Sequence, residues 1–298
     1  MLPLDKVLEG LMRRYSERVP DVDVILSALE DQGLVANRAD IENDHIAFRT
    51  LGVPQLGIRS FEKIFKHYGY QKRDAYHFES KKLDAIWYAP PEPRYPRIFV
   101  SELHVGDLSL EAQRIIQSYT NEVIGDPVER LDLDSGEVVD IFLHSALWRL
   151  PTWADYSRLL AESEYAAWVI YNRYYLNHFT ISVHSLPEPY NTVAGINVLV
   201  EKAGVKLNNS GGMIKTSPDS LLLQSSTVAE LVDAQFADGD WHRIAGSYVE
   251  FAERRVLPEF AGLAAAEIKG FHRRDGFEAG NADNIFESTF LSQTGNQG

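Results

Sequence analysis

The sequence predicts an α+β fold in which two βαβββ modules form one curved, mixed sheet, with helical additions at the N-terminus and in the middle of the chain. The first observation is a pair of similar strand-like stretches, one containing His45 and the other containing His178. The second observation is that each stretch is followed by a turn, a helix-like segment and further strand-like runs. A unit repeated in this way can bring two imidazoles together in one cavity.

Residues 1–38 are expected to form N-terminal helices, because Leu4, Val7 and Leu11 recur at the spacing of one helix face. The first module is expected within 40–105. Its apolar patterns predict a strand, a helix and three further strands, at about 45–50, 57–68, 71–79, 83–89 and 97–103.

The middle of the chain, 106–175, has helical periodicity and is expected to be an insert that covers one side of the sheet. The second module is expected within 176–256, with its first strand beginning near 177. Its helix and later strands are expected at about 190–203, 213–216, 220–227 and 244–253. The C-terminal segment, 257–298, has a tail rich in Gly, Asn and Asp, expected to be irregular apart from 285–289. Together these parts are expected to form a single catalytic domain, 1–298.

The composition narrows the possible functions. The chain has no cysteine, which excludes disulfides, iron–sulfur clusters and thiol nucleophiles and leaves His, Asp and Glu as the strong metal ligands. A net charge of −14 argues against nucleic acid or an anionic membrane as the main partner, but one buried arginine could still hold a small anion. No apolar run is long enough for a membrane helix and no secretory signal is visible, so a cytoplasmic location is expected.

Both histidine-containing strands are expected to be polar on one face. Side chains alternate along a strand, so His45 shares a face with Arg49. The face of His178 is likewise expected to carry Thr180, Ser182 and His184. The apolar residues between them would pack against helices. This pattern suits a sheet that curves around a polar pocket, and Arg49 in that pocket would favour an anionic substrate.

A third metal ligand is expected from a carboxylate on a late strand, and Glu250 is the candidate. In an extended segment it would share a face with Tyr248, whereas in a helix Glu250 and Arg254 would form a surface pair. The local pattern leaves both interpretations open. Two histidines and one carboxylate form the ligand set of non-haem Fe(II) oxygenases, although Zn or Mn could occupy the same set.

Five short stretches together resemble the 2-oxoadipate dioxygenase/decarboxylase family, a distant relative of the vicinal-oxygen-chelate enzymes with their paired βαβββ modules. The stretches are Asp44–Thr50, Ser101–Leu103, Asn177–Thr180, Gln224–Thr227 and Tyr248–Phe251.

The resemblance implies that His45, His178 and Glu250 bind the metal and that Arg49 binds substrate and serves catalysis. The implied cofactor is Fe(II), with Zn, Mn, Ni or Co as ions that could occupy the site after purification. The implied substrates are a small anionic 2-oxo acid, 2-oxoadipate first, and O2. The implied products are 2-hydroxyglutarate and CO2. The alternatives are a metal-dependent isomerase or lyase of the same superfamily, or a protein that binds a small ligand or metal without catalysis.

Several other polar residues are candidates for the pocket. Ser182, Gln224 and Ser225 are expected to contact substrate, and the remaining candidates for its lining are Ser101, Glu102, His184 and Lys215. His104 and His242 add possible metal nitrogens outside the repeated position. Four histidines are expected to be structural or on the surface: His67, His77, His144 and His272. The sequence does not specify an oligomeric state.

Overall fold

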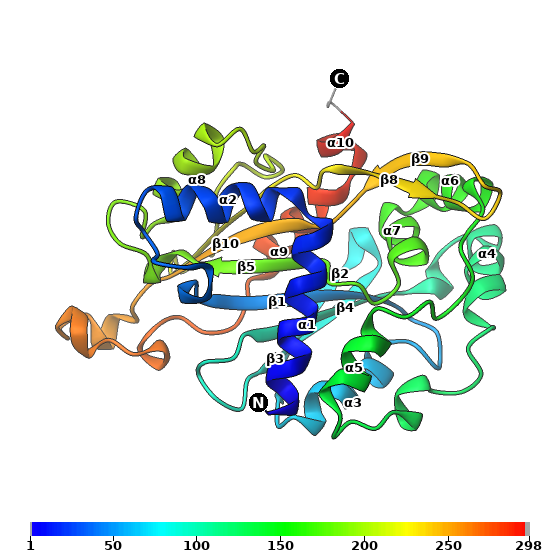
Figure 1. Cartoon of the computed structure of the whole chain (residues 1–298), viewed down its shortest axis with the longest axis horizontal. Helices are drawn as coiled ribbons and strands as arrows, with labels where there is room; N and C mark the ends of the chain where they lie inside the picture. Colours follow the sequence, from blue (N-terminus) through cyan, green and yellow to red (C-terminus); the bar gives the residue numbers. More distant parts are fainter. Residues whose placement is uncertain (1, 296–298) are drawn as a thin grey trace.

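Eight strands form one mixed sheet in a computed structural model that describes residues 2–295 (Figure 1). Their order across the sheet is β2-β3-β4-β1-β5-β10-β7-β6. The first-module strands are β1 (Asn43–Leu51), β2 (Gln71–Phe78), β3 (Leu83–Ala89) and β4 (Arg97–Leu103). The second-module strands are β5 (His178–Ser182), β6 (Lys215–Thr216), β7 (Leu222–Ser226) and β10 (Tyr248–Arg254).

The two halves of the sheet have matching topology. Strand β1 pairs parallel to β4, and β5 pairs parallel to β10 in the same way. The halves join through an antiparallel β1–β5 pair at the centre. The first strands of the two modules are therefore neighbours, and the predicted α+β architecture of two modules sharing a mixed sheet is confirmed.

Helices precede the first module, lie within each module and fill the sequence between the two modules. The N-terminal pair is α1 (Pro3–Arg18) and α2 (Pro20–Asp31), each beginning at a proline, whose fixed φ angle suits the first helical position. The module helices are α3 (Ile58–His67) and α8 (Val193–Lys202). Between the modules lie α4 (Leu110–Thr120), α5 (Gly136–Leu143), α6 (Trp153–Glu162) and α7 (Glu164–Asn172), as the helical periodicity predicted. No helix within residues 2–295 is both long and apolar enough to cross a membrane.

One face of the central strands packs against helices. Phe48 of β1 contacts Phe61 and Phe65 of α3, with ring centroids 4.7 and 5.7 Å away. Phe179 of β5 lies against Tyr15 of α1, which runs across the central strands in Figure 1. The opposite face of the same strands therefore carries the alternate residues, including His45 and His178.

Two parts of the fold differ from the sequence-based expectations. A separate hairpin of β8 (Leu231–Gln235) and β9 (Trp241–Ala245) stands between β7 and β10, where no strand pair was predicted. The tail was predicted to be irregular, but it forms α9 (Ala279–Phe286) and α10 (Leu291–Thr294). Burial of Ile285 and Phe286 against the core compensates for the poor helix propensity of the Gly and Asn residues there. The last three residues of the predicted C-terminal segment lie outside the described residues.

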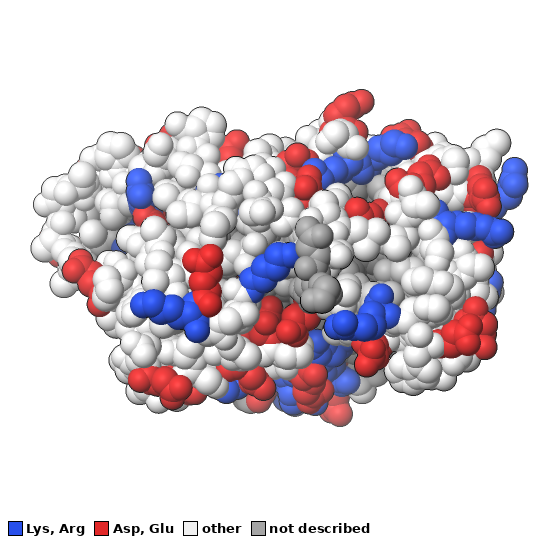
Figure 2. Space-filling model, turned by 90° about the horizontal axis from the view of Figure 1, so that it is seen from above, with Lys and Arg blue, Asp and Glu red and all other residues white. Residues whose placement is uncertain are grey.

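The surface carries charges of both signs. On the face shown in Figure 2, Lys and Arg side chains are interspersed with Asp and Glu. Over the whole chain, 43 acidic residues outnumber 29 basic ones, which gives the net charge of −14. The acidic side chains form no single continuous block on this face.

Candidate metal centre

The register of three adjacent strands brings His45, His178 and Glu250 together. Thr180 of β5 pairs with His45 of β1 on one side and with Glu250 of β10 on the other. His178 precedes Thr180 by two residues and so shares its face of the sheet. The extended conformation of β10 decides between the two interpretations of Glu250, because the segment is a strand and not a helix.

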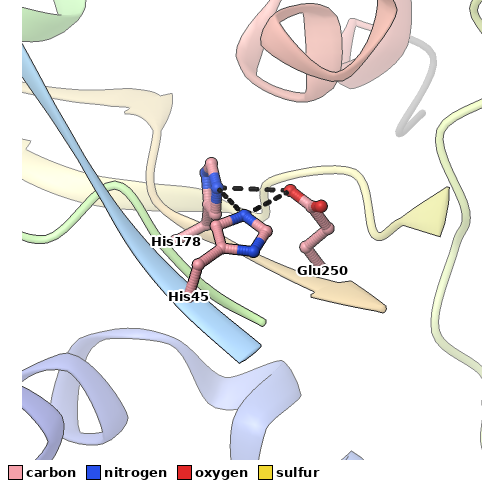
Figure 3. A group of neighbouring side chains, drawn as sticks. All are labelled: His45, His178 and Glu250. Carbon is pink, nitrogen blue, oxygen red and sulfur yellow. Dashed lines mark hydrogen bonds and ion pairs between the residues drawn. The ribbon is translucent and has the colours of Figure 1, made fainter. Parts of the chain in front are cut away.

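The three side chains converge on one point (Figure 3). The Nε2 atoms of His45 and His178 lie 3.4 Å apart, and Glu250 Oε2 lies 3.5 Å from the first and 3.2 Å from the second. All three residues are buried. Neighbouring ligands that each lie about 2.1 Å from one ion are separated by about 3 Å, so this triangle fits a transition metal.

A carboxylate orients the His45 ring. Asp44 Oδ1 lies 2.8 Å from His45 Nδ1, which directs Nε2 towards the other two ligands. Arg254 in turn holds Asp44 through two hydrogen bonds of 2.6 and 2.9 Å. Burial raises the pKa of the Asp44 carboxyl, but the guanidinium groups of Arg254 and Arg97 more than reverse this, so that its pKa lies well below the usual range. Asp44 is therefore anionic.

His178 has a different partner. Its Nδ1 lies 3.1 Å from the amide oxygen of Asn177, which is a neutral group. Burial lowers the pKa of His178 well below its usual value, and the neighbouring His45 and Arg49 side chains lower it further. An imidazole that is neutral can donate its Nε2 lone pair to a metal.

Glu250 is held by an amide chain. Gln224 Nε2 donates to Glu250 Oε1 at 2.6 Å, and Asn281 Nδ2 of α9 donates to Gln224 Oε1 at 2.9 Å. One carboxylate oxygen is thus engaged by Gln224 while the other faces the two imidazoles. Gln224 was predicted as a substrate contact. It lines the cavity, but its amide nitrogen donates its hydrogen bond to Glu250.

A small cavity lies over the triangle. Its lining combines polar and apolar side chains: His45, His178, Gln224, Tyr248, Glu250, Phe99, Phe277, Ala282, Ile285 and Phe286. Its free volume of ≈ 20 Å³ is little more than one water molecule needs. The C-terminal residues 277–286 therefore close the site, a contribution that sequence reasoning missed because these residues belong to no repeat.

Arg49 is buried just outside this lining. Its guanidinium donates to Thr289 Oγ1 at 2.9 Å and to the Phe286 carbonyl at 3.0 Å. Aromatic rings surround it, including Tyr165 at 5.1 Å and Trp168 at 5.3 Å. Among residues 2–295, no carboxylate lies within ion-pair distance of Arg49.

Two polar atoms in this region, one of them on Arg49 itself, are buried without a hydrogen bond. They are Arg49 Nε and the hydroxyl oxygen of Tyr248, within the described part of the chain. Burial lowers the pKa of Arg49, and the nearby phenol of Tyr248 opposes this effect. A buried cation without a paired anion is costly, so the arrangement is suited to receive an anionic group.

Two of the predicted substrate contacts lie away from the cavity. Ser225 points to the opposite face of β7, where its hydroxyl donates to Asn197 of α8 at 2.6 Å. Ser182 lies at the end of β5 and donates to Glu42 at 3.3 Å. Neither is among the residues that line the cavity.

The other candidates for the pocket lining have structural partners. The Ser101 hydroxyl contacts Tyr165, and Glu102 accepts a hydrogen bond from the Ile58 amide at the start of α3. Lys215 donates to the Asn208 carbonyl, and burial lowers its pKa to about 8. His184 was predicted to share the face of His178, but β5 ends at Ser182, and His184 instead accepts from the Arg254 amide.

The remaining histidines are also outside the triangle. His242 stacks on Trp153 with ring centroids 3.7 Å apart, and His104 contacts Asp84 at 2.8 Å.

The sequence analysis missed the supporting residues Asp44 and Asn177. A signal existed, because each residue directly precedes a candidate histidine, and such a side chain can reach the Nδ1 atom of its neighbour.

Comparison with known proteins connects this geometry to a family. The family model described as 2-oxoadipate dioxygenase/decarboxylase matches residues 7–266. The chloroplastic 2-oxoadipate dioxygenase/decarboxylase of Arabidopsis thaliana is 44% identical over 261 residues, which span 84% of this chain and 68% of that relative.

Solved structures agree in fold. The hydroxyglutarate synthase from Oryza sativa, crystallised in complex with 2-oxoadipate, is 42% identical, has a TM-score of 0.88 and is matched over 96% of this chain and 92% of its own. A structure from Ralstonia eutropha JMP134 named for the glyoxalase superfamily is 21% identical, with a TM-score of 0.71 over 92% and 85% of the two chains, and shares the fold. The chain therefore belongs to the 2-oxoadipate dioxygenase/decarboxylase family.

Proposed function

We propose that this protein is an Fe(II)-dependent dioxygenase/decarboxylase that converts 2-oxoadipate and O2 to 2-hydroxyglutarate and CO2. The observation that carries the proposal is the buried triangle of His45, His178 and Glu250 in a chain of this family. Ferrous iron in such a site would activate O2 and offer free coordination positions to a 2-oxo acid. Zn, Mn, Ni or Co could occupy the same ligands.

The reaction balances without a second organic substrate. The bond between C1 and C2 of 2-oxoadipate breaks and C1 leaves as CO2, while C2 becomes the carboxylate of the shortened product. One oxygen atom of O2 enters that new carboxylate, and the other is inserted into a C–H bond at C3, which becomes the hydroxyl-bearing carbon of 2-hydroxyglutarate. The 2-oxo acid thus supplies all the electrons that O2 requires.

The charges of the site favour an anionic substrate. Two neutral imidazoles and one carboxylate would leave a divalent ion with net positive charge. Arg49 provides a second cation close by, with no ion-pair partner in the described chain. We infer that a substrate carboxylate approaches Arg49 and the Tyr248 hydroxyl, where it would satisfy the two unpaired polar atoms. Fixing the carbon chain at this end would hold the reacting carbons in one orientation.

The apolar side chains of the lining have a separate role. Phe99, Phe277 and Phe286 line the cavity beside the ligands, and the Phe277 ring is 4.7 Å from the His45 ring. These rings would exclude bulk water from the reaction. A six-carbon diacid exceeds a free volume of ≈ 20 Å³, so we infer that residues 277–286 shift when the substrate enters.

Oxygen consumption tests the proposal. The metal-free protein, reconstituted with Fe(II) under anaerobic conditions and then given 2-oxoadipate and O2, should release one CO2 and one 2-hydroxyglutarate for each O2 consumed. Glu250→Gln should bind less iron and lose turnover. No uptake of O2 with 2-oxoadipate or with other 2-oxo acids would refute the oxygenase function. An isomerase or lyase would instead turn over without O2, and a binding protein would show no turnover.

The cytoplasmic location is a prediction from the sequence. The Arabidopsis relative is named a chloroplastic protein, so the comparison does not support the expected cytoplasmic location. Neither nucleic acid nor membrane is proposed as a partner.

A further inference from the structure

A second group of metal-binding side chains lies on the first module, away from the triangle of His45, His178 and Glu250. His77 lies on β2, Asp84 on β3 and His104 directly after β4. Each offers one ligand atom, and the three atoms lie within 4.8 Å of one another. Nothing in the proposed oxygenase reaction uses these residues.

The strand register places these side chains next to one another. His77 pairs directly with Asp84 across β2 and β3. Asp84 pairs with Glu102 across β3 and β4, and His104 follows Glu102 by two residues, which returns it to the same face. The His104 amide also donates to the Lys82 carbonyl at 2.8 Å, which holds the end of β4 against the start of β3. The cluster is therefore built on paired backbone, and not on a loose loop.

Both imidazoles face one carboxylate. His77 Nδ1 lies 2.7 Å from Asp84 Oδ1, and His104 Nε2 lies 2.8 Å from Asp84 Oδ2. The two rings are stacked, with centroids 5.6 Å apart and planes inclined by 28°. Two ring nitrogens and a carboxylate thus converge from three strands, and this N2O donor set suits Zn²⁺ and related ions.

The ring nitrogens of His77 and His104 that face away from Asp84 each lie near a further carboxylate. Glu79 Oε2 lies 2.8 Å from His77 Nε2, and Asp107 Oδ2 lies 3.4 Å from His104 Nδ1. Metal-binding histidines commonly direct their second nitrogen to a carboxylate in this way, which orients the ring and increases its basicity. The arrangement is the same as that of Asp44 behind His45 in the buried triangle.

Charge and exposure favour a hydrated cation. With neutral imidazoles, the carboxylates of Glu79, Asp84 and Asp107 give the cluster three negative charges. The side chains of His77 and Asp84 are 52% and 49% exposed, so water can complete the coordination. Lys82 Nζ donates to the Asp107 backbone carbonyl at 2.7 Å, and not to the carboxylate of that residue.

We propose that His77, Asp84 and His104 form a surface site for a divalent transition-metal ion of the Zn²⁺ type, separate from the buried centre. The ion would bind His77 Nδ1, His104 Nε2 and an oxygen of Asp84, with water at its remaining positions. It would link the ends of β2, β3 and β4. The competing arrangement is a pair of protonated histidines held by carboxylates, with no metal.

Stoichiometry of Zn²⁺ binding tests the proposal with the metal-free full chain. Native mass spectrometry and calorimetric titration with Zn²⁺ alone should show two bound ions in the wild type. The surface ion should be lost in His77→Gln and in His104→Gln, and the buried ion should be lost in His45→Gln. His67→Gln is the matched control, because His67 is a surface imidazole with a single carboxylate partner, Asp134, at 2.9 Å.

The outcomes separate this site from the proposed oxygenase centre. Two ions that persist in both His77→Gln and His104→Gln would overturn the surface site, as would a single ion in the wild type that only His45→Gln removes. A single wild-type ion that His77→Gln removes would support the surface site and count against the buried one. Oxygen consumption by Fe(II)-loaded His77→Gln should match the wild type, since the surface site takes no part in turnover.

Discussion

The Gln224 amide holds Glu250 at 2.6 Å through Oε1, while Oε2 of the same carboxylate faces both imidazoles. This division of the two oxygens gives Glu250 one orientation towards the metal position. Residues that orient metal ligands in this way commonly contribute to affinity although they never touch the ion.

Gln224→Ala should therefore weaken Fe(II) or Zn²⁺ binding at the buried site by about 10- to 100-fold. A competition titration against a chelator measures the change. Ser225→Ala is the matched control, because the neighbouring side chain points to α8 and bonds to Asn197. Equal metal affinity in Gln224→Ala and the wild type would show that Glu250 needs no such support.

Arg49→Lys should retain the metal but reduce kcat/KM for 2-oxoadipate by about 100-fold, because a lysine lacks the planar pair of donors that a carboxylate accepts. Steady-state kinetics together with metal analysis measures both effects. Thr289→Val removes the Arg49–Thr289 hydrogen bond without removing the charge, and it should keep most of the activity. A similar loss in both variants would mean that Arg49 acts only by anchoring the C-terminal segment.

The sequence predicted which three side chains come together better than it predicted what surrounds them. Alternation along short strands was a sufficient signal for His45 and His178, because a buried sheet strongly constrains which side chains share a face. The same rule could have separated Gln224 from Ser225, since adjacent residues on a strand point to opposite faces. The contributions of Phe277 and Asn281 were not predictable locally, because tertiary packing and not helix propensity orders that segment.

Asp44→Asn should destabilise the fold by about 3 kcal/mol, because it leaves the buried Arg254 guanidinium without its anion. The pKa of Asp44 in the folded protein is below its unfolded value, so its contribution to stability is present above about pH 4 and disappears as the pH falls through the folded pKa. Denaturant unfolding at pH 7 and at pH 3 measures the difference, which should shrink at the lower pH.

Asp219→Asn provides the control for that experiment. Asp219 pairs with Arg274 at 3.3 Å, but its side chain is 45% exposed, so its loss should cost less than about 1 kcal/mol. An Asp44→Asn variant as stable as Asp219→Asn at pH 7 would contradict the role assigned to the buried pair.

Asp21 should make the protein less stable as the pH rises towards 7. Burial raises its pKa from 3.8 to about 7, and the negative charge of Glu230 adds to the effect. Because the folded state holds this proton more tightly than the unfolded state, stability falls between about pH 4 and pH 7.

Asp21→Asn should remove that loss. The variant should match the wild type near pH 4 and exceed its unfolding free energy at pH 8 by on the order of 2–4 kcal/mol. Denaturant unfolding across this pH range measures the effect. Asp23→Asn is the control, because Asp23 lies in the same helical turn with a side chain that is 64% exposed. If Asp21→Asn is no more stable than the wild type at pH 8, then the Asp21 carboxylate is solvated well enough to ionise without cost.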